Sequence, residues 1–95
     1  MEIGSAIRKI RRDRELRQND LAVSVGITQA YLSGIEKGNK NPSTEVLNKI
    51  ANYFKIPLAI IYWDSMSEED VHPSKLEAFR VLKPSIDGLI KEMFK

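Results

Sequence analysis

The stretch "QNDLAVSVGITQAYLSGI", from Gln18 to Ile35, contains two short helical patterns on either side of a glycine. In the first pattern the apolar residues recur at helical spacing, which predicts a helix over residues 18–25. These inward positions are Leu21, Ala22 and Val25. Gly26 suits the left-handed conformation that commonly ends a helix. Thr28 is then a good N-cap for a second helix, which we expect to end at Gly38.

The second helix of this stretch has two different faces when its residues are placed at about 100° per position. One face is apolar and is predicted to be buried through Leu32 and Ile35. The other face holds small or polar residues, namely Gln29, Ala30, Ser33 and Gly34. A helix exposed only for solubility would more naturally carry long charged side chains there. A slim face of this kind fits the major groove of B-DNA, which is wide enough to admit a helix.

Helical patterns also account for the chain on both sides of this stretch. Ile3, Ile7 and Ile10 predict a first helix over residues 2–14, with its arginines Arg8, Arg12 and Arg14 interpreted as a solvated face. A fourth helix is expected from Thr44 to Phe54 and a fifth from Leu58 to Trp63. No alternating strand pattern competes with these helices, so the predicted fold class is all-α.

Composition and charge restrict the classes of function. A chain of 95 residues is expected to form one small globular domain with little room for a second, enzymatic one. It has no cysteine and a single histidine, His72, so neither a metal site nor any other cofactor is expected. Its carboxylates have no histidine or nucleophile partner in the pattern, so we do not expect an enzyme.

The distribution of charge is more informative than the net charge of +2. The first 42 residues carry 8 Lys or Arg against 5 Asp or Glu, whereas residues 64–95 carry 5 against 7. A polyanion is therefore expected to bind the first part of the chain. No apolar run is long enough to span a bilayer or to act as a signal peptide, which predicts an unprocessed cytoplasmic chain with no membrane partner.

The wider string "IRKIRRDRELRQNDLAVSVGITQAYLSGIEKGNKNPSTEVLNKIANYFKIP" resembles the Xre family, the lambda-repressor-like DNA-binding domains. Within it, residues 18–35 look like a helix-turn-helix with Gly26 in the turn. The resemblance covers about residues 3–63 and implies a five-helix domain that binds double-stranded DNA. It also implies an ion pair between Arg11 and Glu36 that ties the first helix to the recognition helix.

The resemblance implies roles for residues at matching positions. Base reading is expected from Gln29, Ala30, Ser33 and Gly34, where glutamine can bond an adenine edge and an alanine methyl can touch thymine. Gln18 matches a phosphate-binding glutamine at a helix start. The full set of expected phosphate contacts is Arg17, Gln18, Thr28, Tyr31, Lys37, Asn39, Lys40 and Asn41. Tyr31 has two interpretations, packing at the helix edge or a phosphate bond through its hydroxyl.

Two residues depart from the pattern of the family that the chain resembles. Arg17 stands where a Ser or Thr cap is usual, which removes side-chain capping and offers a cation to phosphate instead. Gly34 stands where many members have a long polar side chain, and glycine costs the helix about 1 kcal/mol relative to alanine. Either fewer bases are read at this position or the backbone must approach closely.

The tail is not covered by the resemblance. Residues 1–63 are predicted to form the DNA-binding domain, 64–72 an acidic linker and 73–95 a C-terminal helical segment. In that segment apolar residues recur at helical spacing, and Pro84 allows either two short helices or one kinked helix. The stripe either caps the core as a sixth element or, as we favour, pairs with a second copy. The predicted dimer interface comprises Tyr62, Trp63, Phe79, Leu82, Ile86, Leu89, Ile90 and Met93.

These patterns together lead to two hypotheses about function. The first is a homodimeric, sequence-specific DNA-binding regulator that reads an inverted repeat, and a repressor because nothing resembles an activation domain. The alternative is an interaction protein whose C-terminal helices bind a different protein, such as a toxin or antirepressor, with DNA binding secondary.

Overall fold

The computed structural model describes residues 1–94, and its regular elements there are all helical. The α-helices are α1 (Ile3–Asp13), α2 (Gln18–Val25), α3 (Gln29–Glu36), α4 (Thr44–Phe54), α5 (Leu58–Ser65) and α6 (Leu76–Met93). Two short 3-10 helices, Glu68–Asp70 and Pro73–Lys75, precede α6. The predicted all-α class is therefore confirmed.

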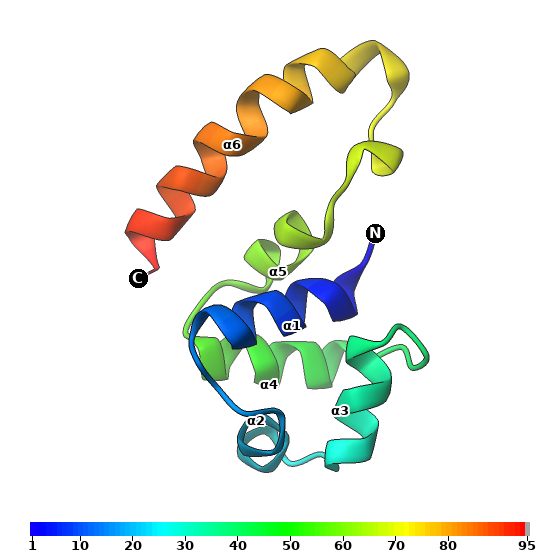
Figure 1. The fold of residues 1–95 in the computed structure, drawn as a ribbon, viewed down its shortest axis with the longest axis vertical. Coiled ribbons are helices and arrows are strands. Elements are labelled where there is room, and N and C mark those ends of the chain that lie inside the picture. The colour runs from blue at the N-terminus through cyan, green and yellow to red at the C-terminus, as the bar shows by residue number, and fades with distance from the viewer. Residues whose placement is uncertain (95) are drawn as a thin grey trace. The chain divides into compact units, whose positions relative to one another are not determined.

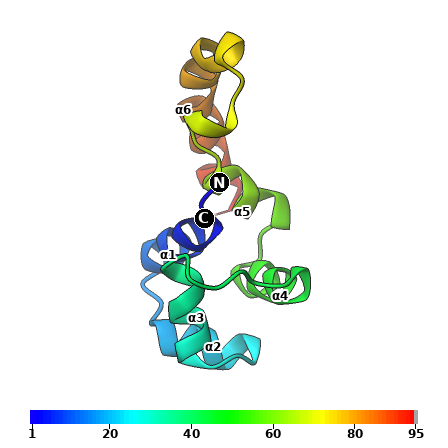
Figure 2. The same ribbon diagram turned by 90° about the vertical axis from the view of Figure 1, so that its right-hand side faces the viewer.

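The first compact unit, Glu2–Ser65, contains α1 to α5 around one apolar core. Helix α1 packs against α3 and α5, and α2 packs against α3 and α4. Helices α2 and α3 lie next to each other at the same end of this unit in both views (Figures 1 and 2). The core includes the fully buried side chains Phe54, Ile7, Leu21, Leu32, Ile35, Ile50 and Ile61. This core holds the α2–α3 pair against the other three helices.

Local signals in the sequence explain most helix ends. Gly26, with φ +76°, ends α2 as expected. Thr28 caps α3 by accepting a hydrogen bond from the Tyr31 amide at 3.0 Å. Helix α3 ends earlier than predicted, at Glu36, because Lys37 forms its C-cap and Gly38 takes the left-handed conformation with φ +83°. Helix α5 instead continues two residues beyond its predicted end, to Ser65.

Arg14 is exposed, as its place on a solvated face predicts, and it also contacts the end of α4. Its Nη1 donates a hydrogen bond to the carbonyl oxygen of Phe54, the last residue of α4. Its guanidinium carbon also lies 5.4 Å from the centroid of the Phe54 ring, within the range of a cation–π contact. The arginine therefore satisfies a carbonyl that the end of α4 leaves open and places a positive charge favourably near the helix dipole.

Gly4 is the point at which α1 approaches the backbone of α3. A Cβ built on Gly4 would lie 1.9 Å from the carbonyl oxygen of Ile35 and 3.2 Å from the Cα of Glu36. No side chain fits in that space without separating the two helices. Sequence patterns alone did not single out this residue, because its constraint comes from the backbone of Ile35, 31 positions away in the chain.

The second compact unit comprises Met1 and the residues from Met66 onward. Helix α6 is one continuous helix (Figure 1), although Pro84 lies inside it and cannot donate the usual hydrogen bond to Arg80. Arg80 binds Glu68 through two hydrogen bonds of 2.8 and 3.1 Å, which lower the pKa of the Glu68 carboxyl. None of the helices within residues 1–94 is long and apolar enough to cross a membrane.

Replacement of Gly4 by alanine is expected to lower the free energy of unfolding by at least about 2 kcal/mol, because the added methyl group overpacks the α1–α3 contact. The measurement is urea unfolding followed by circular dichroism. Gly88 in α6 is the matched control, since a Cβ there meets nothing within 4 Å. Gly88→Ala is expected to be neutral or to stabilise α6 by up to about 1 kcal/mol. An unchanged urea midpoint for Gly4→Ala would contradict the close contact.

Candidate nucleic-acid interface

The turn between α2 and α3 fixes how α3 is presented. The amide of Gly26 bonds the Val23 carbonyl at 3.2 Å, and the amide of Ile27 bonds the Ala22 carbonyl at 3.0 Å. This pair of bonds is the Schellman arrangement that follows a left-handed residue. Ala22 is fully buried, and α2 packs on α3. The orientation of α3 is therefore determined by the core and the turn together.

Helix α3 has the two faces that its sequence predicts. Leu32, Ile35 and Glu36 are buried, and Gln29 and Ala30 are exposed. Ser33 and Gly34, one turn further on, are half-buried. The outward side of α3 thus carries short or polar groups that do not prevent the helix from approaching another surface.

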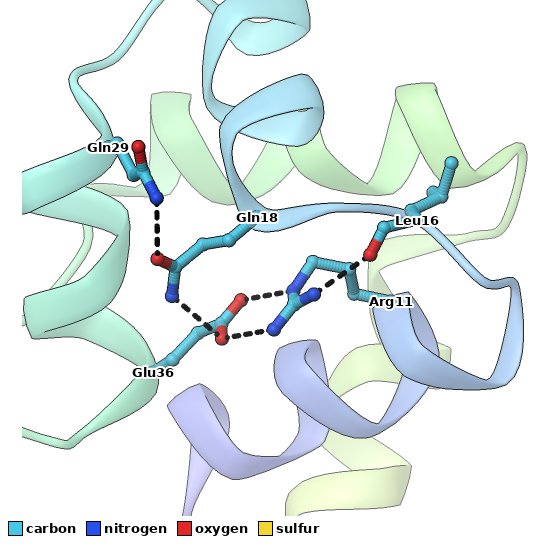
Figure 3. A network of polar contacts seen from close by, with 5 residues as sticks. All are labelled: Arg11, Leu16, Gln18, Gln29 and Glu36. Carbon is cyan, nitrogen blue, oxygen red and sulfur yellow. Dashed lines mark hydrogen bonds and ion pairs between the residues drawn. The ribbon is translucent and has the colours of Figure 1, made fainter.

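A buried ion pair lies beneath this face (Figure 3). The Nε of Arg11 is 2.8 Å from Oε2 of Glu36, and its Nη2 is 2.9 Å from Oε1. Only 8% of Arg11 and 5% of Glu36 are exposed, and Arg11 also donates from Nη1 to the Leu16 carbonyl at 2.8 Å. Hydrogen bonding to the Glu36 carboxylate raises the pKa of Arg11, against the opposing effect of burial. The pair joins α1, the following loop and the end of α3.

Two glutamines extend this network to the surface, as Figure 3 shows. Gln18 Nε2 donates to Glu36 Oε1 at 3.2 Å, and Gln29 Nε2 donates to Gln18 Oε1 at 3.4 Å. Each carboxamide nitrogen carries a second N–H, and Gln29 also retains its carbonyl oxygen as an acceptor. Gln29 can therefore still form two bonds with an adenine edge while Gln18 orients it.

The other expected phosphate contacts lie at helix ends and in the turn after α3. Arg17 is exposed at the N-cap of α2. Its side chain makes no capping hydrogen bond, as expected for an arginine in place of Ser or Thr. Thr28 caps α3, and Tyr31 is half-buried. The exposed residues of the following turn are Lys37, Asn39, Lys40 and Asn41. Their contacts with phosphate stay predictions.

The predicted dimer residues are divided between the two units. Tyr62 and Trp63 are half-buried in α5, whereas the other six lie on α6. On α6, Leu82, Leu89 and Met93 are 54%, 64% and 71% exposed. Phe79, Ile86 and Ile90 are half-buried, and no described residue of α6 is fully buried. Three of these six apolar side chains are thus more than half exposed.

Comparison with known proteins agrees with this geometry. Residues 7–61 match the family model described as "Helix-turn-helix". The chain belongs to the helix-turn-helix family. The resemblance to Xre and lambda-repressor-like domains is thereby confirmed.

Several relatives of this helix-turn-helix protein are transcriptional regulators or repressors by name. It is 32% identical over 88 residues to the cryptic phage CTXphi transcriptional repressor RstR of Vibrio cholerae, covering 93% of this chain and 77% of that one. It is 30% identical over 92 residues to the transcriptional regulator ClgR of Mycobacterium tuberculosis, covering 94% and 82%. The crystal structure of the clp gene regulator ClgR from Corynebacterium glutamicum is similar, with a TM-score of 0.69, 25% identity and coverage of 88% and 89%.

The buried pair of this helix-turn-helix domain provides a test of what supports α3. Glu36→Leu is expected to lower the free energy of unfolding by about 3–5 kcal/mol, because it leaves the Arg11 guanidinium buried without its carboxylate. The double variant Arg11→Met with Glu36→Leu is expected to recover most of that loss, since two apolar side chains replace two buried charges. Urea unfolding of both variants beside the wild type measures the difference. A loss below about 1 kcal/mol for the single variant, the size of an exposed pair, would contradict a buried role.

Proposed function

We propose that this chain is a sequence-specific, double-stranded DNA-binding transcriptional regulator that inserts α3 into the major groove. The observation that carries this proposal is the exposed slim face of α3, held from below by the Arg11–Glu36 pair and the two glutamines. B-DNA has a major groove about 12 Å wide, which accepts a helix whose leading face lacks bulk. The proposed function involves no catalysis. A chain that binds DNA in this way would act in the cytoplasm.

The residues on and around α3 divide into two kinds of contact. Gln29, Ala30, Ser33 and Gly34 are assigned to base edges, with Gln29 bonding adenine and the Ala30 methyl touching thymine. Phosphate contacts position the protein without reading sequence. They are assigned to Arg17, Gln18, Thr28, Tyr31, Lys37, Asn39, Lys40 and Asn41.

Dimer formation is the second part of the proposal. A single small domain buries limited DNA surface, whereas two copies related by a two-fold axis read half-sites about 34 Å apart. The exposed apolar stripe of α6 supports pairing with a second copy, because an amphipathic helix gains most of its stability from burying such a face. A homodimer on an inverted repeat would act as a repressor by occupying its site, and RstR is a repressor by name.

The base-reading role of Gln29 can be tested by selection of bound duplexes from a random DNA library. The wild type is expected to enrich an inverted repeat. Gln29→Ala is expected to lose preference at one base pair of each half-site, with a cost of about 1–3 kcal/mol in discrimination. Asn48→Ala, at an exposed position of α4, is the matched control and is expected to keep the wild-type preference. Identical selected sequences for wild type and Gln29→Ala would contradict base reading by this residue.

The role of α6 can be tested by measuring molecular mass in solution with light scattering. Leu82→Asp combined with Leu89→Asp is expected to convert a dimer into a monomer, because pairing would bury two new carboxylates without partners. Ser85→Asp adds a carboxylate at an exposed polar position of the same helix and is expected to leave the dimer intact. A wild-type monomer, or a double variant that remains dimeric, would exclude pairing through this stripe.

The same exposed stripe favours a second candidate function. An amphipathic helix can place its apolar face in a groove of a different protein. In that case an unrelated chain is expected to co-purify with the wild type and to be lost with Leu82→Asp and Leu89→Asp, while DNA selection enriches nothing. Binding of a specific duplex by a homodimer would favour the DNA-binding regulator over the protein-interaction module.

A further inference from the structure

The turn after α3 folds back onto the last turn of the helix. The amide of Gly38 bonds the Ile35 carbonyl at 3.0 Å, and the amide of Asn39 bonds the Gly34 carbonyl at 2.8 Å. The amide of Lys40 also bonds the Gly34 carbonyl, at 3.2 Å. These bonds, together with the left-handed Gly38, fix the backbone of Lys40 beside Gly34.

The side chain of Lys40 occupies the space that a side chain at position 34 would need. A Cβ built on Gly34 would lie 2.7 Å from the Cγ of Lys40, 3.6 Å from its Cβ and 4.0 Å from its Cδ. The first of these distances is well inside van der Waals contact between carbon atoms. Any residue other than glycine at position 34 therefore has to displace the Lys40 stem.

The position of Gly34 on the helix determines where this stem lies. At about 100° per residue, Gly34 is about 40° from Ala30, on the outward side of α3. Lys40 is exposed, and within residues 1–94 its ammonium group forms no ion pair, unlike Lys49 with Glu45. The charge of Lys40 is therefore available to an external anion at the edge of the α3 face.

We propose that Gly34 is the packing surface for Lys40, and that Lys40 supplies a DNA phosphate contact at the edge of α3 where a side chain from position 34 would otherwise project. This inference rests on the proposed function. It replaces the base contact assigned to Gly34 above: Gly34 becomes a positioning residue that acts through Lys40, and base reading is left to Gln29, Ala30 and Ser33. It also accounts for a glycine in the middle of a helix, where alanine would be the more stable choice.

A double-mutant cycle tests the proposal with wild type, Gly34→Ala, Lys40→Met and the double variant. Methionine keeps an unbranched apolar stem at position 40 without the charge. The dissociation constant for the duplex selected by the wild type is measured over a range of salt concentrations. Lys49→Met on α4 is the control for loss of a lysine outside the interface, and it is expected to bind as the wild type does.

Lys40→Met is expected to weaken binding several-fold and to reduce the slope of log K against log salt by about one, as for loss of one phosphate contact. Gly34→Ala is expected to weaken binding in the same direction while its melting temperature stays equal or rises, because alanine favours the helix. In the Lys40→Met background, the added Gly34→Ala change is expected to alter affinity by less than about twofold, since both changes act on one contact.

Three results would overturn the proposal, and each differs from failure of the proposed function. Additive losses in the cycle would show that Gly34 and Lys40 act independently. A salt slope for Lys40→Met equal to that of the wild type would exclude a phosphate contact by Lys40. A change in the base-pair preference of Lys40→Met without a change in slope would exclude it as well. This test does not depend on whether Gly34→Ala folds. Wild-type affinity for Gly34→Ala would exclude the packing role. By contrast, a wild-type protein that selects no duplex would overturn the proposed function itself.

Discussion

The buried ion pair between Arg11 and Glu36 is the interaction on which the geometry of the interface depends. Two charges in a core are costly unless each meets several partners, and here the arginine reaches both carboxylate oxygens and the Leu16 carbonyl. Each carboxylate oxygen accepts a bond from the guanidinium, and Oε1 also accepts one from Gln18. The arrangement therefore satisfies its charged groups only when α1, α2 and α3 hold their observed positions. That requirement makes the pair a determinant of orientation more than a source of stability.

The polar network and the core perform different tasks at the two sides of α3. On the inner side, Leu32 and Ile35 are almost completely buried and bind the helix to the domain without directional preference. Hydrogen bonds are directional, so the chain from Glu36 through Gln18 to Gln29 orients the first exposed side chain of the helix. A side chain oriented before it meets its ligand loses less conformational entropy on binding. The fold thus orients Gln29 before any ligand is bound.

Local sequence signals predicted the parts of the structure that depend on near neighbours. Gly26, Thr28 and the apolar spacing in residues 18–25 and 44–54 determine helix ends through contacts a few positions away, and those boundaries are correct. The close approach at Gly4 and the contact of Arg14 with α4 were not predicted, because their partners, Ile35 and Phe54, are distant in sequence. The packing of Lys40 on Gly34 depends on the path of a turn, which residue types alone do not specify. The roles of individual residues toward DNA stay predictions of the resemblance.

The length of α3 limits how much sequence one copy of the domain can recognise. The helix has eight residues and is terminated by Lys37 and the left-handed Gly38, so it cannot lengthen along a groove. In a C₂H₂ zinc finger, for comparison, one short helix in the major groove contacts about three successive bases. A DNA sequence of about that length occurs many times among the roughly 10⁶ or more sites of a genome. A single α3 therefore cannot specify one binding site in a genome. The remaining sequence specificity has to come from DNA shape or from a second copy of the same helix.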